Sequence, residues 1–427
     1  MSYNRIATPR AFVDLISYNL AHGWSALANI TALKGVNGGS GTVPITYDSG
    51  STIEMFDMKP SNHVVIDADN KQFYIQYDSE FSSDTLAESS FLAILNHNLD
   101  DACVVINVDI SDNAAFPAIV GSTAVDFTAS SDRIGGSGLF GSFAVGDLIL
   151  VSNAGESGNN GVKTVTSIHA NYVGVSENLT DESASRAITV QGFTRISTTG
   201  NHTKVINAAE GASAGEINPA TNGWTLITWP TQTSDNKYLR ITFTDDVGYG
   251  HDFDTDVKIG SILYGEIVDW AHSPDMGITT TIDYDGTTLQ QSVGGSTYAN
   301  STHFGQPKWN TTTPWNLNAS STQHTYTFQR RYGRLNHSMK FSYLADTDVF
   351  APNQHGATAS DWFDSDNLHA SFHQRILGQH LPFLFTIDGT STIEGDYGLF
   401  RLANSGFKST QVAHRMWDVA LDITESW

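Results

Sequence analysis

Fifteen histidines make metal binding the first chemistry to consider. His369 and His373 are four residues apart on a stretch with helical periodicity, so both rings would lie on one face, and His380 follows closely. That spacing can hold a divalent cation. No carboxylate stands between the two histidines as it does in a catalytic zinc helix, and the same stretch is an ordinary amphipathic face. We therefore expect no metal ion and no cofactor.

Aspartate pairs are the second candidate for chemistry. They occur as Asp-x-Asp at 67–69, 254–256 and 346–348, and carboxylate oxygens are the ligands that Ca²⁺ prefers. None is followed by the glycine and distant glutamate of a helix–loop–helix calcium site, so turns at strand ends are the favoured interpretation. Two acids could also hydrolyse a glycosidic bond, but a sequence does not give their separation.

Nucleophilic and phosphate-binding motifs are missing from the sequence. Its single cysteine, Cys103, lies in the apolar run 102–106, which predicts a buried small hydrophobic residue. One cysteine also excludes an intramolecular disulfide. The glycine cluster 135–138 lacks the Lys-Ser/Thr of a phosphate-binding loop and indicates a tight turn. The sequence therefore predicts no catalytic residue and a protein that is not an enzyme.

Tryptophans in polar surroundings indicate binding rather than catalysis. Trp309 and Trp315 enclose a run of Asn, Thr and Pro, and Trp362 lies among Ser and Asp. Such residues can anchor a contact between subunits or stack on a sugar ring. The alternative is that they close one end of a sandwich.

Basic residues gather in one place of an otherwise acidic chain, from Arg330 to Lys340. A local positive patch favours contact with an acidic neighbouring surface, including that of another copy. The alternative is a solvated strand edge. The candidate interface residues are Arg330, Arg331, Arg334, Lys340, Trp309, Trp315 and Trp427.

Composition excludes several function classes. Lys and Arg number 22 against 45 Asp and Glu, so the formal charge is 22 − 45 = −23. That sign repels phosphate backbones and anionic membranes, so we expect no nucleic-acid partner. No apolar stretch approaches the ~18 residues that span a bilayer, and the N-terminus lacks the apolar core of a secretion signal. We expect synthesis in a cytoplasm and no membrane insertion.

The elements that would position these residues are mostly strands. Short β-branched or aromatic runs at 64–66, 73–77 and 238–243 are bounded by Gly, Asn, Asp and Ser. One helix is expected from Asp366, as its cap, to Gln379, with Gly378 stopping it. The segment from Arg10 to His22 fits either a helix or a strand.

The chain, at 427 residues, is long enough for two or three domains. Residues 1–120 and 195–270 look like halves of one sandwich, with 121–194 inserted as a small β-barrel. Loops accept insertions because ends that already lie close cost little closure entropy. Within the insert, Asn159-Asn160-Gly161 indicates a hairpin. Residues 271–427 form a third, β-rich domain carrying the helix.

Short motifs resemble virion structural proteins of tailed bacteriophages. Residues 93–99 (AILNHNL) and 256–265 (DVKIGSILYG) resemble their galactose-binding-like jelly roll, where one strand ends in His-Asn-Leu and a later strand contains Lys-Ile-Gly. Parts of the insert resemble small β-domains that decorate tail proteins, and 264–275 and 381–427 are similar to tail-tip and distal-tail components. The predicted fold class is therefore all-β, a multi-domain, jelly-roll-like β-sandwich with an inserted small β-barrel and a C-terminal β-rich domain.

The resemblance implies a scaffold, a ring that is often sixfold and links the tail tube to the tip or fibres. Its partners would be copies of itself and other tail proteins (tube, hub and fibres), and its location the phage tail. It implies no catalytic residue.

Three hypotheses follow in order of preference. The first is the distal-tail or tail-tip scaffold, which is a homo-oligomer. The second is a carbohydrate-binding virion protein that recognises a host surface glycan, with Trp or Tyr beside Asn and Asp in a shallow groove. The third is a glycan-degrading enzyme, which needs two convergent carboxylates in a cleft.

Overall fold

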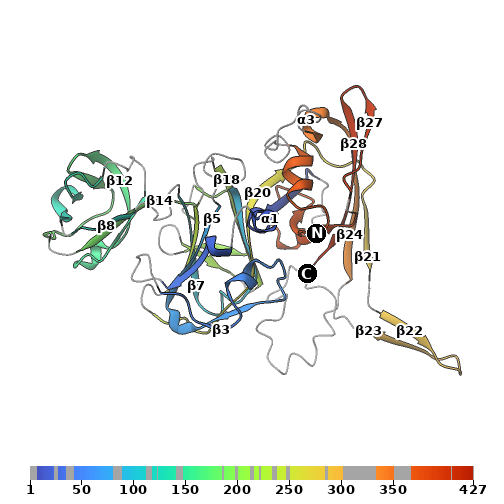
Figure 1. The fold of residues 1–427 in the computed structure, drawn as a ribbon, viewed down its shortest axis with the longest axis horizontal. Coiled ribbons are helices and arrows are strands. Elements are labelled where there is room, and N and C mark those ends of the chain that lie inside the picture. Colours follow the sequence, from blue (N-terminus) through green and yellow to red (C-terminus); the bar gives the residue numbers. More distant parts are fainter. Residues whose placement is uncertain are drawn as a thin grey trace.

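The structure is a computed structural model, and it places most of the chain in antiparallel strands (Figure 1). The all-β, multi-domain sandwich class predicted from the sequence is confirmed. The described residues are 7–23, 27–34, 43–79, 89–111, 118–122, 124–140, 148–184, 187–197, 201–211, 216–220, 223–232, 238–246, 251–283, 287–301, 333–350, 367–404 and 406–426.

A β-sandwich is built from two facing layers. One layer contains β2 (Ile30–Lys34), β5 (Gln72–Asp78), β19 (Tyr238–Asp245) and β7 (Val104–Ser111), in that order, with β16 (Ala208–Glu210) and β17 (Ile217–Pro219) beside β7. The other contains β15 (Lys204–Ile206), β18 (Gly223–Gln232), β6 (Ser89–His97) and β20 (Val257–Asp269), with β4 (Val64–Ile66) and β3 (Tyr47–Ser49) attached. Three predicted strands, at 64–66, 73–77 and 238–243, are confirmed.

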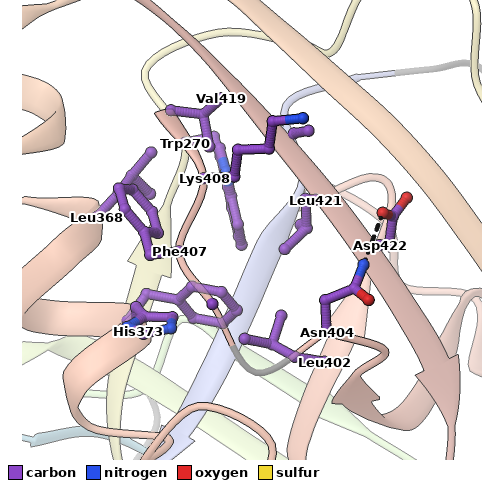
Figure 2. A pocket seen from close by; sticks show the side chains of 13 residues that line it. Trp270, Leu368, His373, Leu402, Asn404, Phe407, Lys408, Val419, Leu421 and Asp422 are labelled. Atoms are coloured by element: carbon purple, nitrogen blue, oxygen red, sulfur yellow. Dashed lines mark hydrogen bonds between the residues drawn. The ribbon is translucent and has the colours of Figure 1, made fainter. Parts of the chain in front are cut away.

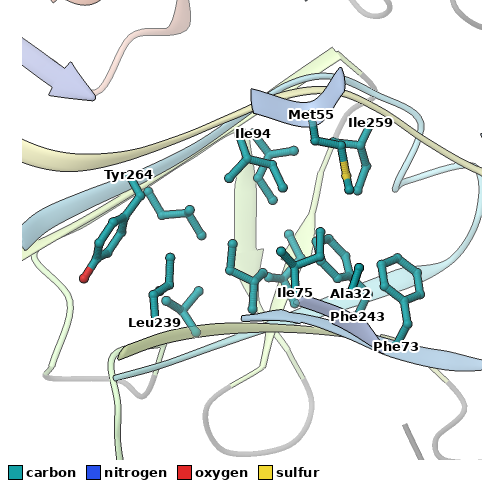
Figure 3. Packing of buried hydrophobic residues seen from close by; sticks show 14 of the residues in the cluster. Ala32, Met55, Phe73, Ile75, Ile94, Leu239, Phe243, Ile259 and Tyr264 are labelled. Atoms are coloured by element: carbon teal, nitrogen blue, oxygen red, sulfur yellow. The ribbon is translucent and has the colours of Figure 1, made fainter. Parts of the chain in front are cut away.

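The sandwich core lies between these layers (Figure 3). Ile94 and Ile259 project from one layer toward Phe73 and Phe243 of the other, whose rings stack with centroids 4.7 Å apart. Short 3₁₀ helices close the ends: η1 (Leu27–Asn29), η2 (Thr52–Phe56) and η3 (Ala68–Asn70). Burying each large apolar side chain contributes about 1.5–3 kcal/mol, which makes this cluster a main source of stability.

Two of the sequence motifs meet in this sandwich. β6 pairs with β20, with His97 opposite Ile259. The Asn98 side chain accepts from the backbone N–H of Lys258 (2.6 Å) and donates to the carbonyl of Asp256 (2.9 Å). A Cβ on Gly260 would lie 2.3 Å from a backbone oxygen, so the Lys-Ile-Gly strand requires glycine there. The motif residues therefore determine strand pairing rather than form a site.

The N-terminal strand β1 (Arg10–Asp14) lies inside one of the two 13-stranded sheets, here named the long sheet. It pairs with β20 on one side and with β25 (Phe383–Thr386) on the other. The helix α1 (Leu15–His22) follows directly, capped by the Asp14 side chain, which accepts from the backbone N–H of Ser17 (2.8 Å). The segment Arg10–His22 is thus a strand and then a helix, although the sequence pattern allowed only one or the other.

The insert is a small antiparallel unit around its own apolar cluster. Its elements are β8 (Ala118–Ser122), β9 (Asp126–Thr128), η5 (Ala129–Ser131), β10 (Arg133–Gly135), β11 (Leu148–Ser152), η6 (Ser157–Asn159), β12 (Gly161–His169), β13 (Tyr172–Val175) and β14 (Ile188–Arg195). β14 leaves the insert and pairs with β7, with Thr194 opposite Ile110. The predicted hairpin forms between β11 and β12, but residues 153–160 connect the strands, so Asn160-Gly161 is not a two-residue turn.

The C-terminal part extends the sheet that β1 joins. Beyond β25 come β26 (Tyr397–Leu402), β28 (Met416–Glu425), β24 (Arg334–Ala345) and β21 (Thr279–Asp283), while β27 (Ser409–Ala413) pairs with β28. The remaining elements are α3 (Asp346–Val349), η8 (Leu368–Gln374), η9 (Glu394–Asp396) and the hairpin β22 (Thr287–Gln291) with β23 (Thr297–Ser301). One sheet therefore contains strands from both sides of the domain boundary expected near residue 270.

The helix expected at 366–379 differs in type and extent. Residues 368–374 form a π-helix, η8, and Asn367 is its cap, accepting from the backbone N–H of Ala370 (2.9 Å). Gly378 has φ of +63° and ends the turn that follows. Leu368, Phe372 and Ile376 are buried as their spacing predicts.

Replacing His97 by Gln should flatten the dependence of stability on pH in acid. Burial lowers the pKa of His97 from 6.5 to about 3. Between these values the unfolded chain binds a proton that the folded chain does not, so the free energy of unfolding falls as pH drops. The fall is up to about 1.4 kcal/mol per pH unit. Urea unfolding across this pH range measures it.

The matched control is His251→Gln, because His251 is exposed. His251→Gln should keep the same dependence of unfolding free energy on pH as the unmodified protein. His337 also contributes to this dependence, since burial lowers the pKa of His337 to about 4. An unchanged slope in His97→Gln would contradict this role for His97.

Candidate assembly surface

The two histidines of the helix lie together but pack as aromatic rings. The ring centroids of His369 and His373 are 6.0 Å apart, and both rings contact Phe407. Burial, and then the neighbouring His373, lower the pKa of His369. Among the residues that the structure describes, no three His, Cys, Asp or Glu side chains are grouped as ligands for a metal ion.

The aspartate pairs serve turns. Asp67 accepts from the backbone N–H of Asp69 (2.9 Å), and Asp256 accepts from that of Ala68 (3.2 Å). Asp348 accepts from the backbone N–H of residue 345, at the start of α3. The contacts of Asp67 and Asp348 are the local turn contacts expected of aspartate, whereas Asp256 reaches the start of η3, 188 residues away along the chain.

Cys103 is partly exposed, so the prediction of a buried residue is wrong. It has φ of +54° in the turn between β6 and β7, and Ala102 is the buried neighbour. Its thiol donates to Asp254 (3.2 Å). That hydrogen bond, then burial and the charges of nearby aspartates, raise the pKa of Cys103 to about 11. A thiol held in this state is a poor nucleophile.

A cavity of about 270 Å³ lies between η8 and β28 (Figure 2). At its polar rim, the Asn404 amide donates to Asp422 (3.1 Å), and Lys408 and His373 are nearby. Its apolar wall consists of Trp270, Leu368, Phe372, Leu402, Phe407, Val419 and Leu421. Nothing in the spacing of these residues along the sequence marks them as a group, because four separate segments contribute.

A larger cleft of about 670 Å³ lies between β21, β24 and the segment 385–397. Its acids are engaged with the protein: Asp396 accepts from Ser391 (2.5 Å), and Glu425 accepts from the backbone N–H of Leu335 (2.8 Å). The hydrogen bond from Thr390 lowers the pKa of Asp388. A general acid in glycoside hydrolysis needs a raised pKa, so Asp388 is not suited to that role.

The predicted interface residues fall mostly outside the described ranges. Those outside are Trp309, Trp315, Arg330, Arg331 and Trp427. Arg334 and Lys340 both lie on β24. The Lys340 ammonium is paired with Asp418 of the same chain (2.6 Å), and this hydrogen bond raises the pKa of Lys340. The acidic group that Lys340 meets thus belongs to its own chain.

The strand β21 forms an exposed edge of the long sheet. All five of its residues, Thr279 to Asp283, are exposed, and Ile282 is 58% exposed. Within the described part of the chain, β21 pairs only with β24. Native edge strands usually carry Lys, Pro or a bulge that blocks further pairing, and β21 has no Lys or Pro.

The hairpin of β22 and β23, here named the arm, stands away from the sandwich and the C-terminal sheet (Figure 1). Its strands pair with each other and with no other described strand. Leu289, Val293 and Tyr298 are 68%, 111% and 61% exposed. The arm was not predicted from the sequence. Gly294-Gly295 between two Thr-rich segments was the available signal, and Gly295 has φ of +85° in the turn.

No family model matches the chain, and no curated protein has a significant match to it. Within the described ranges, no helix has the length and apolar content to cross a membrane. Functional inference therefore rests on the geometry above.

Alkylation of Cys103 should be slow near neutral pH and should accelerate up to about pH 11. Raising the thiol pKa from 9.0 to about 11 lowers the thiolate fraction near neutrality, by about a hundredfold at ten-fold per unit. Asp254→Asn removes the charged acceptor, so the pKa should fall and the rate should rise. Iodoacetamide labelling followed by mass spectrometry at several pH values measures both.

Asp252→Asn is the matched control, because Asp252 is a nearby acid that pairs with Lys71 instead. It should leave the labelling rate as it is. If Asp254→Asn also leaves the rate unchanged, Asp254 does not control this thiol.

Proposed function

We propose that this protein is a structural, non-catalytic subunit of a bacteriophage tail, of the distal-tail or tail-tip type, which assembles into a homo-oligomeric ring. The arm is the observation that supports this most directly. An isolated two-stranded hairpin is marginally stable in water and becomes stable when a third strand or another surface covers it. The arm exposes Leu289 and Tyr298 without such a cover in the described chain.

Each face of the arm carries an exposed apolar side chain. Leu289 is opposite Ala299, and Tyr298 is opposite Gln290, so Leu289 and Tyr298 lie on opposite faces. Neither face can be buried by the other, and Val293 lies at the tip. Exposed apolar residues grouped on one projecting element mark an interaction site more than scattered ones do.

The rest of the molecule suits a scaffold role. The long sheet joins the sandwich to the C-terminal part without a flexible linker, because β1 pairs with both. The small insert is attached through β14 alone among the described strands. A rigid body with an attached module fits the resemblance to tail components that link a tube to fibres.

A second candidate, carbohydrate binding by a virion protein, is supported by the cavity in Figure 2. An aromatic wall with an Asn–Asp pair at the rim is a combination that can hold a sugar ring. Trp270 is only 3% exposed, however, so little of its ring is available for stacking. Saturable binding on a glycan array that Asn404→Ala abolishes would favour this candidate.

The purified protein should form a closed oligomer of several copies, and this association should strengthen with salt. Each copy carries a formal charge of −23, so copies repel one another at low ionic strength. At about 0.15 M salt the Debye length falls to about 8 Å and this repulsion is largely screened. Light scattering at low and high salt measures the mass, and a monomer under both conditions would overturn the proposal.

Replacing residues 287–301 by a short Gly-Ser linker should produce a folded monomer. Thr287 and Ser301 are paired, so a short linker joins the cut ends at little entropic cost. The melting temperature should stay within a few degrees, because the arm pairs with no other described strand. Light scattering and thermal unfolding measure the two effects.

Val412→Ser is the control for this deletion, since Val412 is an exposed apolar residue on β27, which lies apart from the arm. It should assemble as the unmodified chain does. An arm-deleted protein that still assembles would place the subunit contact elsewhere.

A further inference from the structure

We infer that the arm of one copy of this chain adds to the free edge of β21 in a second copy, so that one sheet continues between subunits. The inference rests on the proposed function, and it names both the partner and the position of the contact. Two elements would make this contact. The arm pairs with no other described strand, and β21 has a described partner, β24, on one side only.

The backbone of β21 offers the contact. β21 is the last strand of its sheet, and β24 pairs with it along its whole length, from Thr279 opposite Ser338 to Asp283 opposite Arg334. Its other side presents N–H and C=O groups that no other described strand takes up. Such an edge is a template for strand addition by another chain.

The side chains on both elements suit a sheet. β21 has the sequence TTTID, and the arm strands are TTLQQ and TYANS. Thr, Ile and Tyr are residues that strands favour, and cross-strand pairs of β-branched or aromatic residues contribute about 0.2–1 kcal/mol each. Pairing would also place Ile282 beside side chains of the arm on the same face of the continued sheet.

The charge distribution allows a second copy to reach this edge. Two copies with a formal charge of −23 each repel over most of their surfaces. Residues 286–302 contain no Asp, Glu, Lys, Arg or His, and β21 contains only Asp283. An uncharged arm on an almost uncharged edge lets two acidic bodies approach with the least repulsion.

The connection between the two elements supports an exchange. Three residues, 284–286, separate β21 from β22. A connection of that length commonly joins two adjacent antiparallel strands, yet among the described strands β22 pairs with β23 and not with β21. A pairing that is possible within one chain but is not made there can be made between copies, as in domain swapping.

Cross-linking between differently marked chains tests the contact. In a Cys103→Ser background, chains carrying Thr281→Cys on β21 are mixed with chains carrying either Gln290→Cys or Ala299→Cys on the arm. Mixing at low salt and raising the salt lets the two kinds assemble together. We expect a bismaleimide to form cross-linked pairs about a hundredfold faster than for dilute chains, because contact raises the effective concentration to the millimolar range.

The matched control acceptor is Thr410→Cys on β27, which is also an exposed strand of the same sheet. All variants lie at exposed positions, and their melting temperatures should equal that of the background protein. Cross-linking that prefers Thr281 over Thr410 supports the inference.

Two other outcomes are distinguishable. An oligomer by light scattering whose arm cysteines cross-link to Thr410, or to neither acceptor, overturns the inference and leaves the proposed function standing. A monomer at every salt concentration overturns both.

Discussion

The pairing of β1 on both of its sides is the constraint on which the rest of the structure depends. β20 of the sandwich lies on one side of β1, and β25 of the C-terminal part lies on the other. Asp14, at the end of β1, caps α1 and also accepts from the backbone N–H of Tyr264 (2.9 Å). Gly265 is required opposite it, because a Cβ there would lie 2.1 Å from the carbonyl oxygen of Val13. Five residues near the N-terminus therefore fix two large units in one orientation.

Buried polar contacts also fix that orientation, because they depend on direction and apolar packing does not. Arg375, after η8, is buried and forms an ion pair with Glu266 of β20. Removing one partner of such a pair costs about 3–5 kcal/mol, because the other charge stays buried without compensation. The apolar clusters cross the same boundary: Ala11 and Val13 belong to the C-terminal core, whereas Phe12 packs with Phe91 of β6. Alternate residues of β1 thus serve two cores.

Local sequence patterns predicted the strands, but they failed where contacts between distant residues determine the structure. The alternation at 238–243 predicted a half-buried strand; the strand is present, but Arg240 and Thr244 on its polar face are buried as well. The π-helix at 368–374 buries the residues that the spacing selects, but its cap is Asn367, and the predicted cap Asp366 lies outside the described residues. Cys103 was misassigned because it lies, with φ of +54°, in the turn before β7 and not in the buried strand itself. No local pattern reveals that β1 has two partners, since both lie more than 200 residues away along the chain.

The motifs that carry the resemblance and the proposed assembly surface are therefore different parts of this sequence. Asn98 and Gly260 make contacts that hold β20 beside β6 and the segment after it in this chain. The arm and β21 consist of Thr, Gln, Ser and a few apolar residues, which satisfy only general requirements of strand formation. A contact made through backbone hydrogen bonds constrains side chains weakly, since any residue except proline carries the donor. In an acidic chain of this kind, the absence of charge on a projecting hairpin is then a stronger sign of assembly than any particular residue.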